Sequence, residues 1–312
     1  MKKTVITIGS ALIILVAIFK VSAQTQTKEN PKEMYREESM RKFEISNTAE
    51  QLKTGTVWTY NYGGIKVHAY ETKDVFNSYV YIIEKDGKAL LIETPPVSDN
   101  YSELVGYINK LGYKKIDVIT SYHPIGATFF ETDKLTFKNI YSMKHAVENY
   151  KTGPGSQSLP GLKERIGDAM DIQVVEPTAW LNEGENEVSG IKIITKNIDF
   201  AFSVEIPEIN AVHIHMLGHN RHNLIFSYDF LDAYIALLKN FQAKGYDMYL
   251  SSHSEPETIA DVSIKIGYLE NLKQIANSSA NKQEFLKKMN EAYPYFGWPF
   301  YLKGTANFLF KD

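Results

Sequence analysis

Histidines are the residues of this chain whose type and placement could support chemistry. The 312 residues include eight histidines and no cysteine. Disulfides and thiolate ligands are thereby excluded, and any transition metal must be held by His, Asp or Glu. Six of the histidines stand near the end of an expected strand or the expected start of a helix: His123, His213, His215, His219, His222 and His253. The loops that follow buried strands are common places for ligands.

A structural role is the alternative for the histidines near strands. His123 is equally an ordinary loop residue before Pro124. His213 and His215 alternate along one strand and point the same way, so both suit buried, hydrogen-bonded side chains as well as ligands. His253 follows a short apolar strand at a loop. Spacing alone does not decide between the two roles.

The same two interpretations apply to the segment that follows Gly218. His219 and His222 are three residues apart and share a face if a helix starts there. They then either bind a substrate or hydrogen-bond to a neighbouring loop as part of a polar helix start. Tyr122 could donate a hydrogen bond to a substrate oxygen, although it is one of 20 tyrosines.

Composition limits the class of protein and of partner. The chain is 44% hydrophobic and 12% aromatic, enough to bury a full core, and its formal net charge is -3. Acidic and basic residues are mixed along the chain, so no basic block indicates nucleic acid or an anionic membrane surface. A small-molecule substrate or ligand, without nucleic acid, is the expected partner.

The first residues predict export. Lys2 and Lys3 precede an apolar run at 5–19, which is followed by Val21-Ser22-Ala23. This is the pattern of a Sec signal peptide at 1–23, cleaved after Ala23, and it places the mature protein in the periplasm or outside the cell. The alternative is a membrane anchor, but the run is shorter than the ~20 residues that span a bilayer. We therefore expect no stable membrane insertion after cleavage.

The remaining chain divides into a leader and one domain. Residues 24–53 are polar and charge-rich, and we expect them to lie outside the core. From 54 to 312 the sequence alternates or runs apolar at strand length. A first set of expected strands precedes one helix and a return strand: 57–62, 65–70, 78–83, 89–92, helix 101–111 and strand 116–120. A second set repeats that order: strands 172–175, 191–195, 200–206 and 211–215, helix 230–241, strand 248–251 and a long helix from near Glu257.

Two strand sets with helices after each favour a four-layer α/β arrangement, in which two sheets pack face to face between outer helices. The aromatic tail at 293–310 is expected to pack back onto this body.

Several sequence segments, in the same order along the chain, resemble the metallo-β-lactamase superfamily, which has the αββα fold. They are 77–81 with 89–94, 181–185, 190–193, and 232–235 through Ser251-Ser252-His253.

The diagnostic signature of that superfamily is largely replaced here. Its loop of form H-x-H-x-D-H holds two metal ions directly after a buried strand. The corresponding stretch is Ser121-Tyr122-His123-Pro124-Ile125-Gly126, in which only the second histidine matches. A gapped alignment loses the same ligands. A two-metal centre therefore lacks enough protein donors.

The resemblance continues at the later ligand positions. The next family histidine falls near Asp199, the bridging carboxylate near His215, and the terminal histidine at His253. The segment 218–224 also resembles a Thr-His-x-x-His-Asn-Leu segment of the alkyl-sulfatase branch. The implied metal ligands are His123, Asp199, His215 and His253. The implied substrate-binding residues are Tyr122, His219, Arg221 and His222.

Two functions from different classes follow. The first is an exported, metal-dependent hydrolase with a reduced, mononuclear site, in which nitrogen and oxygen ligands hold one zinc ion. Its expected substrate is an ester, an amide or a sulfate ester. The second is a metal-free pseudoenzyme that binds a periplasmic ligand or a protein partner in the same cleft. The lost ligands favour the second, and the surviving histidines favour the first.

Overall fold

The computed structural model describes residues 49–198 and 201–310, which belong to one unit of the chain that extends from Ser39 to Asp312. The expected signal peptide at 1–23, most of the expected leader at 24–53, and Asp199 lie outside the described residues. Within the described part, the ordered sheet structure begins at Glu50.

The first sheet has eight strands in sequence order, from β1 to β8. It begins with an antiparallel meander and continues with parallel strands after β5. Its strands are β1 (Glu50–Gln51), β2 (Thr56–Tyr62), β3 (Ile65–Glu71), β4 (Tyr79–Lys85), β5 (Lys88–Ile92), β6 (Lys115–Ile119), β7 (Thr136–Ser142) and β8 (Ala179–Trp180). The central strand β4 is buried on both faces, which explains its nearly continuous apolar sequence.

The second sheet has six strands in the order β14-β13-β12-β11-β10-β9. Its neighbours pair antiparallel except for β12 and β13, which are parallel. Its strands are β9 (Gly184–Val188), β10 (Ile191–Ile198), β11 (Ala201–Ile206), β12 (Ala211–Ile214), β13 (Met248–Ser251) and β14 (Ser254–Glu257).

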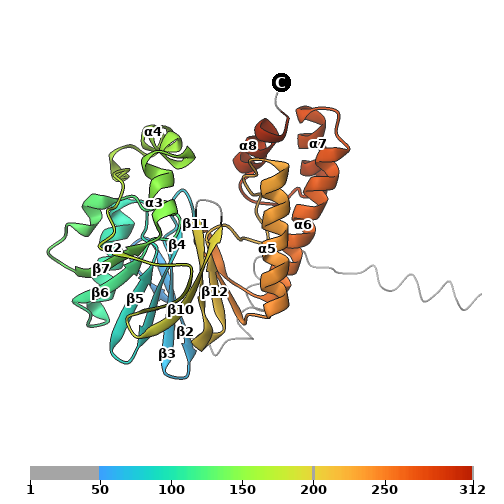
Figure 1. Ribbon diagram of the computed structural model, residues 1–312. Coiled ribbons are helices and arrows are strands. Elements are labelled where there is room, and N and C mark those ends of the chain that lie inside the picture. Colours follow the sequence, from blue (N-terminus) through green and yellow to red (C-terminus); the bar gives the residue numbers. More distant parts are fainter. Residues whose placement is uncertain (1–48, 199–200, 311–312) are drawn as a thin grey trace, which may run out of the picture. The chain divides into compact units, whose positions relative to one another are not determined.

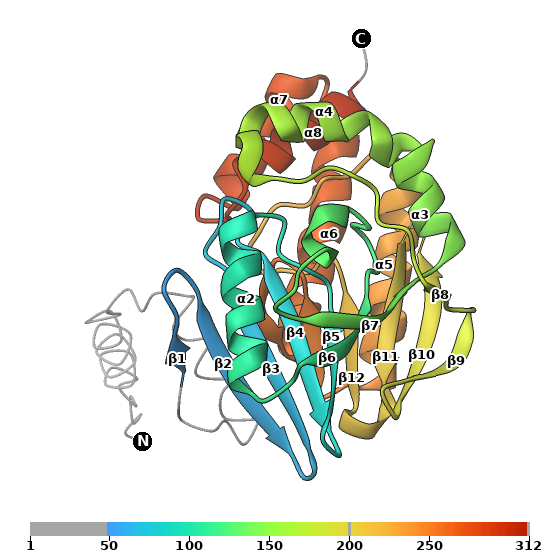
Figure 2. The ribbon, with the colours of Figure 1, turned by 90° about the vertical axis from the view of Figure 1, so that its left-hand side faces the viewer.

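The two sheets pack face to face, with helices on the outer face of each (Figure 1). One apolar cluster joins inward-facing side chains of both sheets, among them Tyr81 and Ile83 of β4 and Val204 of β11. The alternate residues of β4, Val80 and Ile82, face the other way and pack under helix α2 (Ser98–Lys110). Figure 2 shows α2 lying across this outer face. The period of two along each strand thus separates the inter-sheet core from the helix-covered core.

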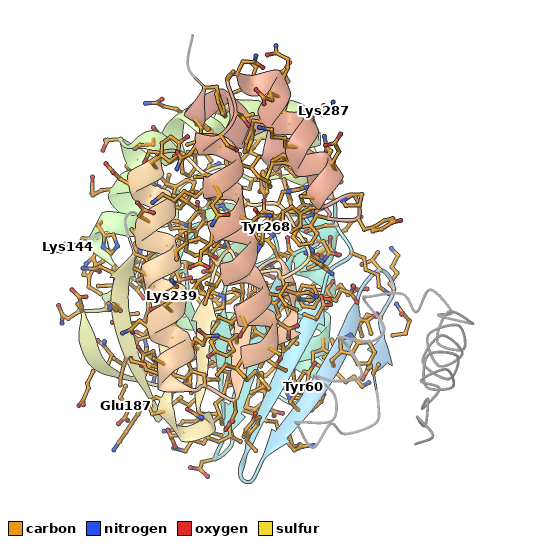
Figure 3. The ribbon with its side chains drawn as sticks, turned by 90° about the vertical axis from the view of Figure 1, so that its right-hand side faces the viewer. Tyr60, Lys144, Glu187, Lys239, Tyr268 and Lys287 are labelled. Atoms are coloured by element: carbon orange, nitrogen blue, oxygen red, sulfur yellow. The ribbon has the colours of Figure 1, made fainter. Side chains whose placement is uncertain are left out.

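Two long helices cover the outer face of the second sheet. They are α5 (Tyr228–Lys244) and α6 (Ile259–Asn277), which run side by side (Figure 3) and share an apolar cluster with strands β12 and β13. Local sequence sets their ends: Ser227 caps α5 through the backbone N–H of Phe230, and Gly245 ends it in the left-handed region. The four-layer αββα arrangement expected from the sequence is confirmed.

The remaining helices lie between and after these elements. Helices α3 (Lys144–Lys151) and α4 (Pro154–Ile166) separate β7 from β8. Helices α7 (Lys282–Ala292) and α8 (Pro299–Leu309) follow α6, and α8 buries Leu302 and Ala306 in the same cluster as α5 and α6. The aromatic tail therefore packs onto the body, as expected.

One expected strand is wrong: residues 172–175 form no strand, and among them only Val174 makes an isolated bridge, to Ile125. The long helix expected from near Glu257 is confirmed. It begins at Ile259, because Thr258 and Asp261 form a capping box there, and Glu257 is the last residue of β14. No helix within the described ranges is both long and apolar enough to cross a membrane.

Candidate active site

Three of the predicted histidines meet where strands of both sheets end. His123 lies in the loop after β6, His215 directly follows β12, and His253 lies in the turn between β13 and β14. Their ring centroids are 4.5 Å apart for His123 and His215, 4.6 Å for His215 and His253, and 6.4 Å for His123 and His253. We call these three residues the histidine group.

The His253 ring has a defined orientation. Its Nδ1 lies 3.1 Å from the backbone oxygen of Phe76, so Nδ1–H donates and the lone pair of the neutral ring is on Nε2. That Nε2 lies 3.1 Å from Nε2 of His215. Two nitrogen ligands of one tetrahedral zinc ion are about 3.3 Å apart, given bonds of about 2.0–2.1 Å. The pair therefore suits either a direct hydrogen bond or a shared cation.

Strand β4 holds the His253 turn against the first sheet. The Tyr81 hydroxyl donates to the backbone oxygen of Ser251 at 2.6 Å and accepts from its N–H at 3.0 Å. The Tyr79 N–H donates to the oxygen of Ser252 at 2.8 Å. These bonds join the two sheets beside the histidine group.

A buried carboxylate shapes the loop that carries His123. Glu93 follows β5 and accepts from the backbone N–H groups of Ser121 at 2.7 Å and Tyr122 at 3.1 Å, and from the Ser121 hydroxyl. Glu93 itself has a φ of 65°, a conformation that costs energy for a non-glycine residue. Burial raises the pKa of Glu93, although the hydrogen bonds from the loop oppose that shift.

Tyr122 covers one side of the histidine group. Its ring stacks on His215 with centroids 3.7 Å apart and planes 2° apart, and it meets His123 edge-on at 4.5 Å. Tyr150 of α3 contacts the far side of His123 at 5.6 Å. Aromatic rings thus limit the rotation of His123 and His215.

All three histidines are neutral at pH 7. Burial lowers the pKa of His123 to about 3, and proximity to His253 lowers it further. Burial also lowers the pKa of His253 to about 4, while the bond to Phe76 opposes this and the charge of Arg221 adds to it. The pKa of His215 is well below its ordinary value, first through burial and then through its histidine neighbours. Neutral imidazoles are the form that binds metal ions.

The histidine nitrogens do not form a complete metal site as they stand. Among the described residues, no group of three or more His, Asp and Glu side chains has the geometry of a metal site. The Nε2 atoms of His215 and His253 have a suitable spacing, but a third donor does not converge with them in this arrangement. A two-metal centre does not fit these residues, and a single ion requires a movement of His123 or a further ligand. Asp199, the fourth predicted ligand, lies outside the described residues.

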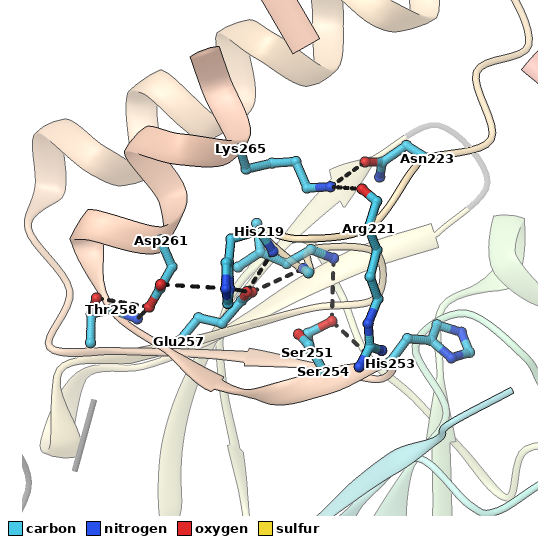
Figure 4. A network of polar contacts seen from close by, with 12 residues as sticks. His219, Arg221, Asn223, Ser251, His253, Ser254, Glu257, Thr258, Asp261 and Lys265 are labelled. Carbon is cyan, nitrogen blue, oxygen red and sulfur yellow. Dashed lines mark hydrogen bonds and ion pairs between the residues drawn. The ribbon is translucent and has the colours of Figure 1, made fainter. Parts of the chain in front are cut away.

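A second group of polar residues lies beside the first and contains a buried ion pair. The carboxylate of Glu257 accepts from the N–H of Gly218 at 2.9 Å, and from the N–H and Nδ1 of His219 at 2.7 Å each (Figure 4). Burial alone lowers the pKa of His219, but Glu257 outweighs it, so the pKa is raised. Burial raises the pKa of Glu257, and the bonds from His219 and Gly218 outweigh that effect and lower it. The pair is therefore ionic.

Lys265 of α6 holds the other end of the same loop. Its Nζ donates to the backbone oxygen of Arg221 at 2.7 Å and to Oδ1 of Asn223 at 2.5 Å (Figure 4). Burial lowers the pKa of Lys265 to about 7, although the charge of Glu257 opposes this shift. His222 is fixed nearby through Nδ1, which lies 3.0 Å from the Tyr268 hydroxyl. Residues 218–223, with Glu257 and Lys265, are called the clamped loop below.

Arg221 extends from the clamped loop toward His253 (Figure 4). Its Cζ lies 5.0 Å from the ring centroid of Trp298, which in turn contacts the His253 ring at 5.1 Å. The side-chain oxygen of Asn77, in the amide orientation that its surroundings require, accepts from Nη1 at 3.1 Å and Nη2 at 2.9 Å. The Arg221 side chain is thus held by two neutral groups.

The structure brings together most of the predicted site. His123, His215, His253, Tyr122 and Arg221 lie together. His219 and His222 hydrogen-bond within the clamped loop and its neighbours, which favours their structural interpretation, and their binding of substrate stays a prediction. His213, the alternative partner on the same strand, contacts the Ser252 hydroxyl at 3.0 Å instead.

Several residues of the site were missed by sequence reasoning. They are Asn77, Glu93, Tyr150, Glu257, Lys265 and Trp298. Glu93 occupies the position where an Asp usually stands in the superfamily, and that was the only signal available for it. Nothing in the local sequence marks Trp298, whose φ of 63° belongs to the backbone turn before α8.

A cleft of about 790 Å³ lies between α3, the start of α4 and the start of α5. Its lining includes His145, Glu148, Asn149, Ser227 and Phe230. None of the three histidines lines this cleft, so it is separate from the histidine group.

Comparison with solved structures identifies the fold. A sec-alkylsulfatase from Pseudomonas sp. matches with a TM-score of 0.51 and 13% identity over 77% of this chain and 48% of its own. A metallo-β-lactamase from Erythrobacter litoralis matches with 0.51 and 11% over 72% and 100%. A metallo-β-lactamase family protein from Thermus thermophilus matches with 0.52 and 13% over 78% and 91%.

The chain therefore has the metallo-β-lactamase fold, as its sequence resemblance implied. It spans about half the length of the alkylsulfatase chains that it matches. Comparison with sequence models of protein families and with curated protein sequences gives no match. At these identities the likeness concerns the fold, and activity has to be argued from the site.

Proposed function

We propose that this protein is a hydrolase with a single-metal site, in which His215 and His253 would hold one zinc ion together with His123, whose side chain has to move to reach it. The observation that supports this most is the Nε2 pair of His215 and His253 at 3.1 Å, with Nδ1 of His253 already bonded to a backbone carbonyl. A hydrogen bond at the second ring nitrogen commonly orients histidine ligands. Asp199 is the proposed fourth ligand. The substrate class is an ester, amide or sulfate ester.

The residues of this chain would have distinct tasks. A bound zinc ion would act as a Lewis acid on the scissile group. Neutral His253 presents its Nε2 lone pair, and Glu93 positions His123 through the backbone of its loop. The stacked ring of Tyr122 holds the plane of His215, and its hydroxyl is a proposed donor to a substrate oxygen. Loss of the second metal position predicts slower turnover than in two-metal relatives.

Metal analysis tests this proposal. We expect at most one equivalent of zinc per untagged chain, and zinc-dependent release of nitrophenol or nitroaniline from 4-nitrophenyl acetate, 4-nitrophenyl sulfate or 4-nitroacetanilide. His253→Ala and His215→Ala should lower zinc affinity by about tenfold or more. His68→Gln is the matched control, because His68 contacts Glu84 and Tyr107 beneath α2 and no member of the histidine group. Two equivalents of zinc, or unchanged binding in both variants, would contradict the proposal.

A second function is favoured by one observation. No group of three donors with metal-site geometry is found in the described part of the chain, and the His215–His253 contact suits a hydrogen bond between neutral rings. A metal-free pseudoenzyme that binds a small periplasmic ligand at the same place is therefore the alternative. It is supported if the purified chain binds no zinc and hydrolyses none of the three probes.

Export from the cytoplasm is part of the proposal and rests on the sequence at 1–23. Mass spectrometry of the periplasmic fraction should find an N-terminus at or near Gln24. A chain that keeps Met1 in the soluble cytoplasmic fraction would contradict it.

A further inference from the structure

The cleft between α3, the start of α4 and the start of α5 has the size of a small-molecule site. Its volume of about 790 Å³ falls within the ~300–1,000 Å³ of pockets that hold organic ligands. Among the described residues that line it, none belongs to the histidine group or to the clamped loop. The proposed hydrolase therefore leaves this cleft without a role.

The carboxylates in the lining give the cleft a negative charge. Glu148 of α3 and Asp229 of α5 are exposed there, and no lysine or arginine of the described chain lines it. Neither carboxylate forms an ion pair within the described ranges. Lys151, at the end of α3, pairs instead with Glu176 at 2.7 Å. The cleft thus attracts a positively charged ligand.

The helix starts beside the cleft are capped, which argues against an anion as the ligand. At the start of α5 the Ser227 hydroxyl accepts from the N–H of Phe230 at 3.1 Å. At the start of α4, Oδ1 of Asn149 accepts from the N–H of Gly155 at 3.0 Å. Helix N-termini bind anions through such N–H groups, and here side chains of the protein already occupy them.

His145 adds an acceptor to the lining. Its Nε2 lies 2.7 Å from the backbone oxygen of Ala201, so Nε2–H donates and Nδ1 of the neutral ring has the lone pair. Together with the carboxylates of Glu148 and Asp229, this nitrogen suits a ligand that donates N–H groups.

Asn149 provides a free donor in a lining that is otherwise rich in acceptors. The residue is only 6% exposed. Its Oδ1 is bonded to Gly155, while Nδ2 has no hydrogen-bond partner in the described part of the chain. The backbone of α4 approaches closely here, because a Cβ at Gly155 would lie 2.6 Å from Nδ2. The amide is thus held in place, and Nδ2 is left for an oxygen of a ligand in the cleft that Asn149 lines.

An aromatic ring lines the same cleft. Phe230 is half-buried, meets Phe226 edge-on at 5.4 Å and stacks with Tyr234 at 6.1 Å. These contacts fix the ring and leave part of it exposed to the carbon chain or the charge of a cationic ligand.

We propose that this cleft binds a small organic cation, a protonated amine that also carries a carbonyl oxygen. Glu148 and Asp229 bind the ammonium group, Asn149 donates from Nδ2 to the oxygen, and the Phe230 ring packs against the carbon chain between them. The inference is independent of the proposed hydrolase, because none of these four residues is a proposed metal ligand or belongs to the histidine group.

NMR titration of the purified chain tests this binding. The probes are Nα-acetyl-lysine amide and Nα-acetyl-norleucine amide, which lacks only the ammonium group. We expect the lysine amide to bind and the norleucine amide to bind at least about tenfold more weakly, since the charge-assisted hydrogen bonds are lost. The affinity should fall between about 20 mM and about 0.5 M NaCl, because salt screens exposed charges. Shifted backbone signals at 148–155 and 227–233 should locate the site.

Variants assign the binding to the two carboxylates. Glu148→Gln and Asp229→Asn should each weaken binding of the lysine amide about threefold, and the double variant about tenfold, as is typical of exposed ion pairs. Glu164→Gln removes the same charge at an exposed position on α4 outside the lining, and is the matched control. All these positions are exposed, so the melting temperature should not change. His215→Ala, which should weaken zinc binding, should bind the probe like the parent chain.

The outcomes separate this inference from the proposed function. Equal binding of both probes, unchanged affinity in the double variant, or no binding of the lysine amide at millimolar concentrations would overturn the inference. Binding that depends on Glu148 and Asp229, in a chain that binds no zinc and hydrolyses no probe, would support the inference and refute the hydrolase. Zinc-dependent hydrolysis without binding of the lysine amide would do the reverse.

Discussion

The histidine group and the clamped loop bury the same type of side chain and give it opposite protonation states. His215 and His253 are 6% and 8% exposed and have no carboxylate neighbour among the described residues, so burial lowers the pKa of both rings. His219 is 2% exposed, yet Glu257 raises its pKa. The neighbouring charge, and not the degree of burial, decides the state of each ring. One region therefore offers neutral donors, and the other supplies a rigid ionic support.

The largest expected effect is a dependence of stability on pH that has opposite signs in the two regions. The histidine group has folded pKa values below 6.5, so its contribution is fully present above pH 6.5 and is lost as the pH falls toward about 3 to 4. Each ring contributes up to about 1.4 kcal/mol per pH unit in that window. His219, with its raised pKa, contributes below pH 6.5 and loses its contribution as the pH rises through its folded value.

Urea unfolding of the metal-free chain between pH 4.5 and 8 measures these slopes. His253→Asn should reduce the slope of unfolding free energy against pH on the acid side, because it removes one ring with a lowered pKa. Imidazole proton shifts in NMR spectra would assign the rings individually. A His219 ring that titrates below pH 6.5 would remove the distinction between the two regions.

A smaller effect is expected from removing one partner of the ion pair. Glu257→Gln leaves protonated His219 buried without its counter-charge, and should lower the free energy of unfolding by about 3 kcal/mol. Glu185→Gln, at an exposed position on β9, is the control that removes a carboxylate away from His219, and a change within about 0.5 kcal/mol is expected. A loss below about 1 kcal/mol in Glu257→Gln would mean that the pair is not ionic.

The smallest effect should come from the ring that covers the histidine group. Tyr122→Ala removes the stack on His215 and should cost about 1 kcal/mol in chemical denaturation. Tyr122→Phe keeps the ring and should retain most of that stability, so the difference between the two variants measures the stack. If both variants lose the same free energy of unfolding, the Tyr122 hydroxyl and not the ring stack accounts for the stability.

Local patterns explain why much of the fold was predictable. Alternation and short apolar runs predicted β2, β3, β5 and β10 to within one or two residues at most ends, because side-chain direction along a strand has a period of two. The strand expected at 172–175 was wrong because apolar residues can be covered without lying in a sheet. Ile172 and Val174 pack, partly buried, against the small cluster with Ile125 and Tyr150, and Val175 is buried in the cluster under α2.

The histidine group was predictable in part because strand ends carry the loops of both sheets to one place. The superfamily resemblance supplied His123, His215 and His253 at separate positions. It could not supply Trp298 and Asn77, which reach Arg221 from segments far apart in the sequence. Such contacts depend on how the C-terminal segment and the start of β4 pack, and no local spacing encodes that packing.

The amino-acid sequence determined the chemistry that is available: nitrogen and oxygen donors without thiols, two strand sets with their helices, and histidines at the ends of strands. Tertiary structure decided the partners and the protonation states of those histidines. It placed Glu257 beside His219 and, within the described ranges, no carboxylate beside His215 and His253. Because a pKa and an ion pair depend on distances across the fold, residue identity alone does not determine either one.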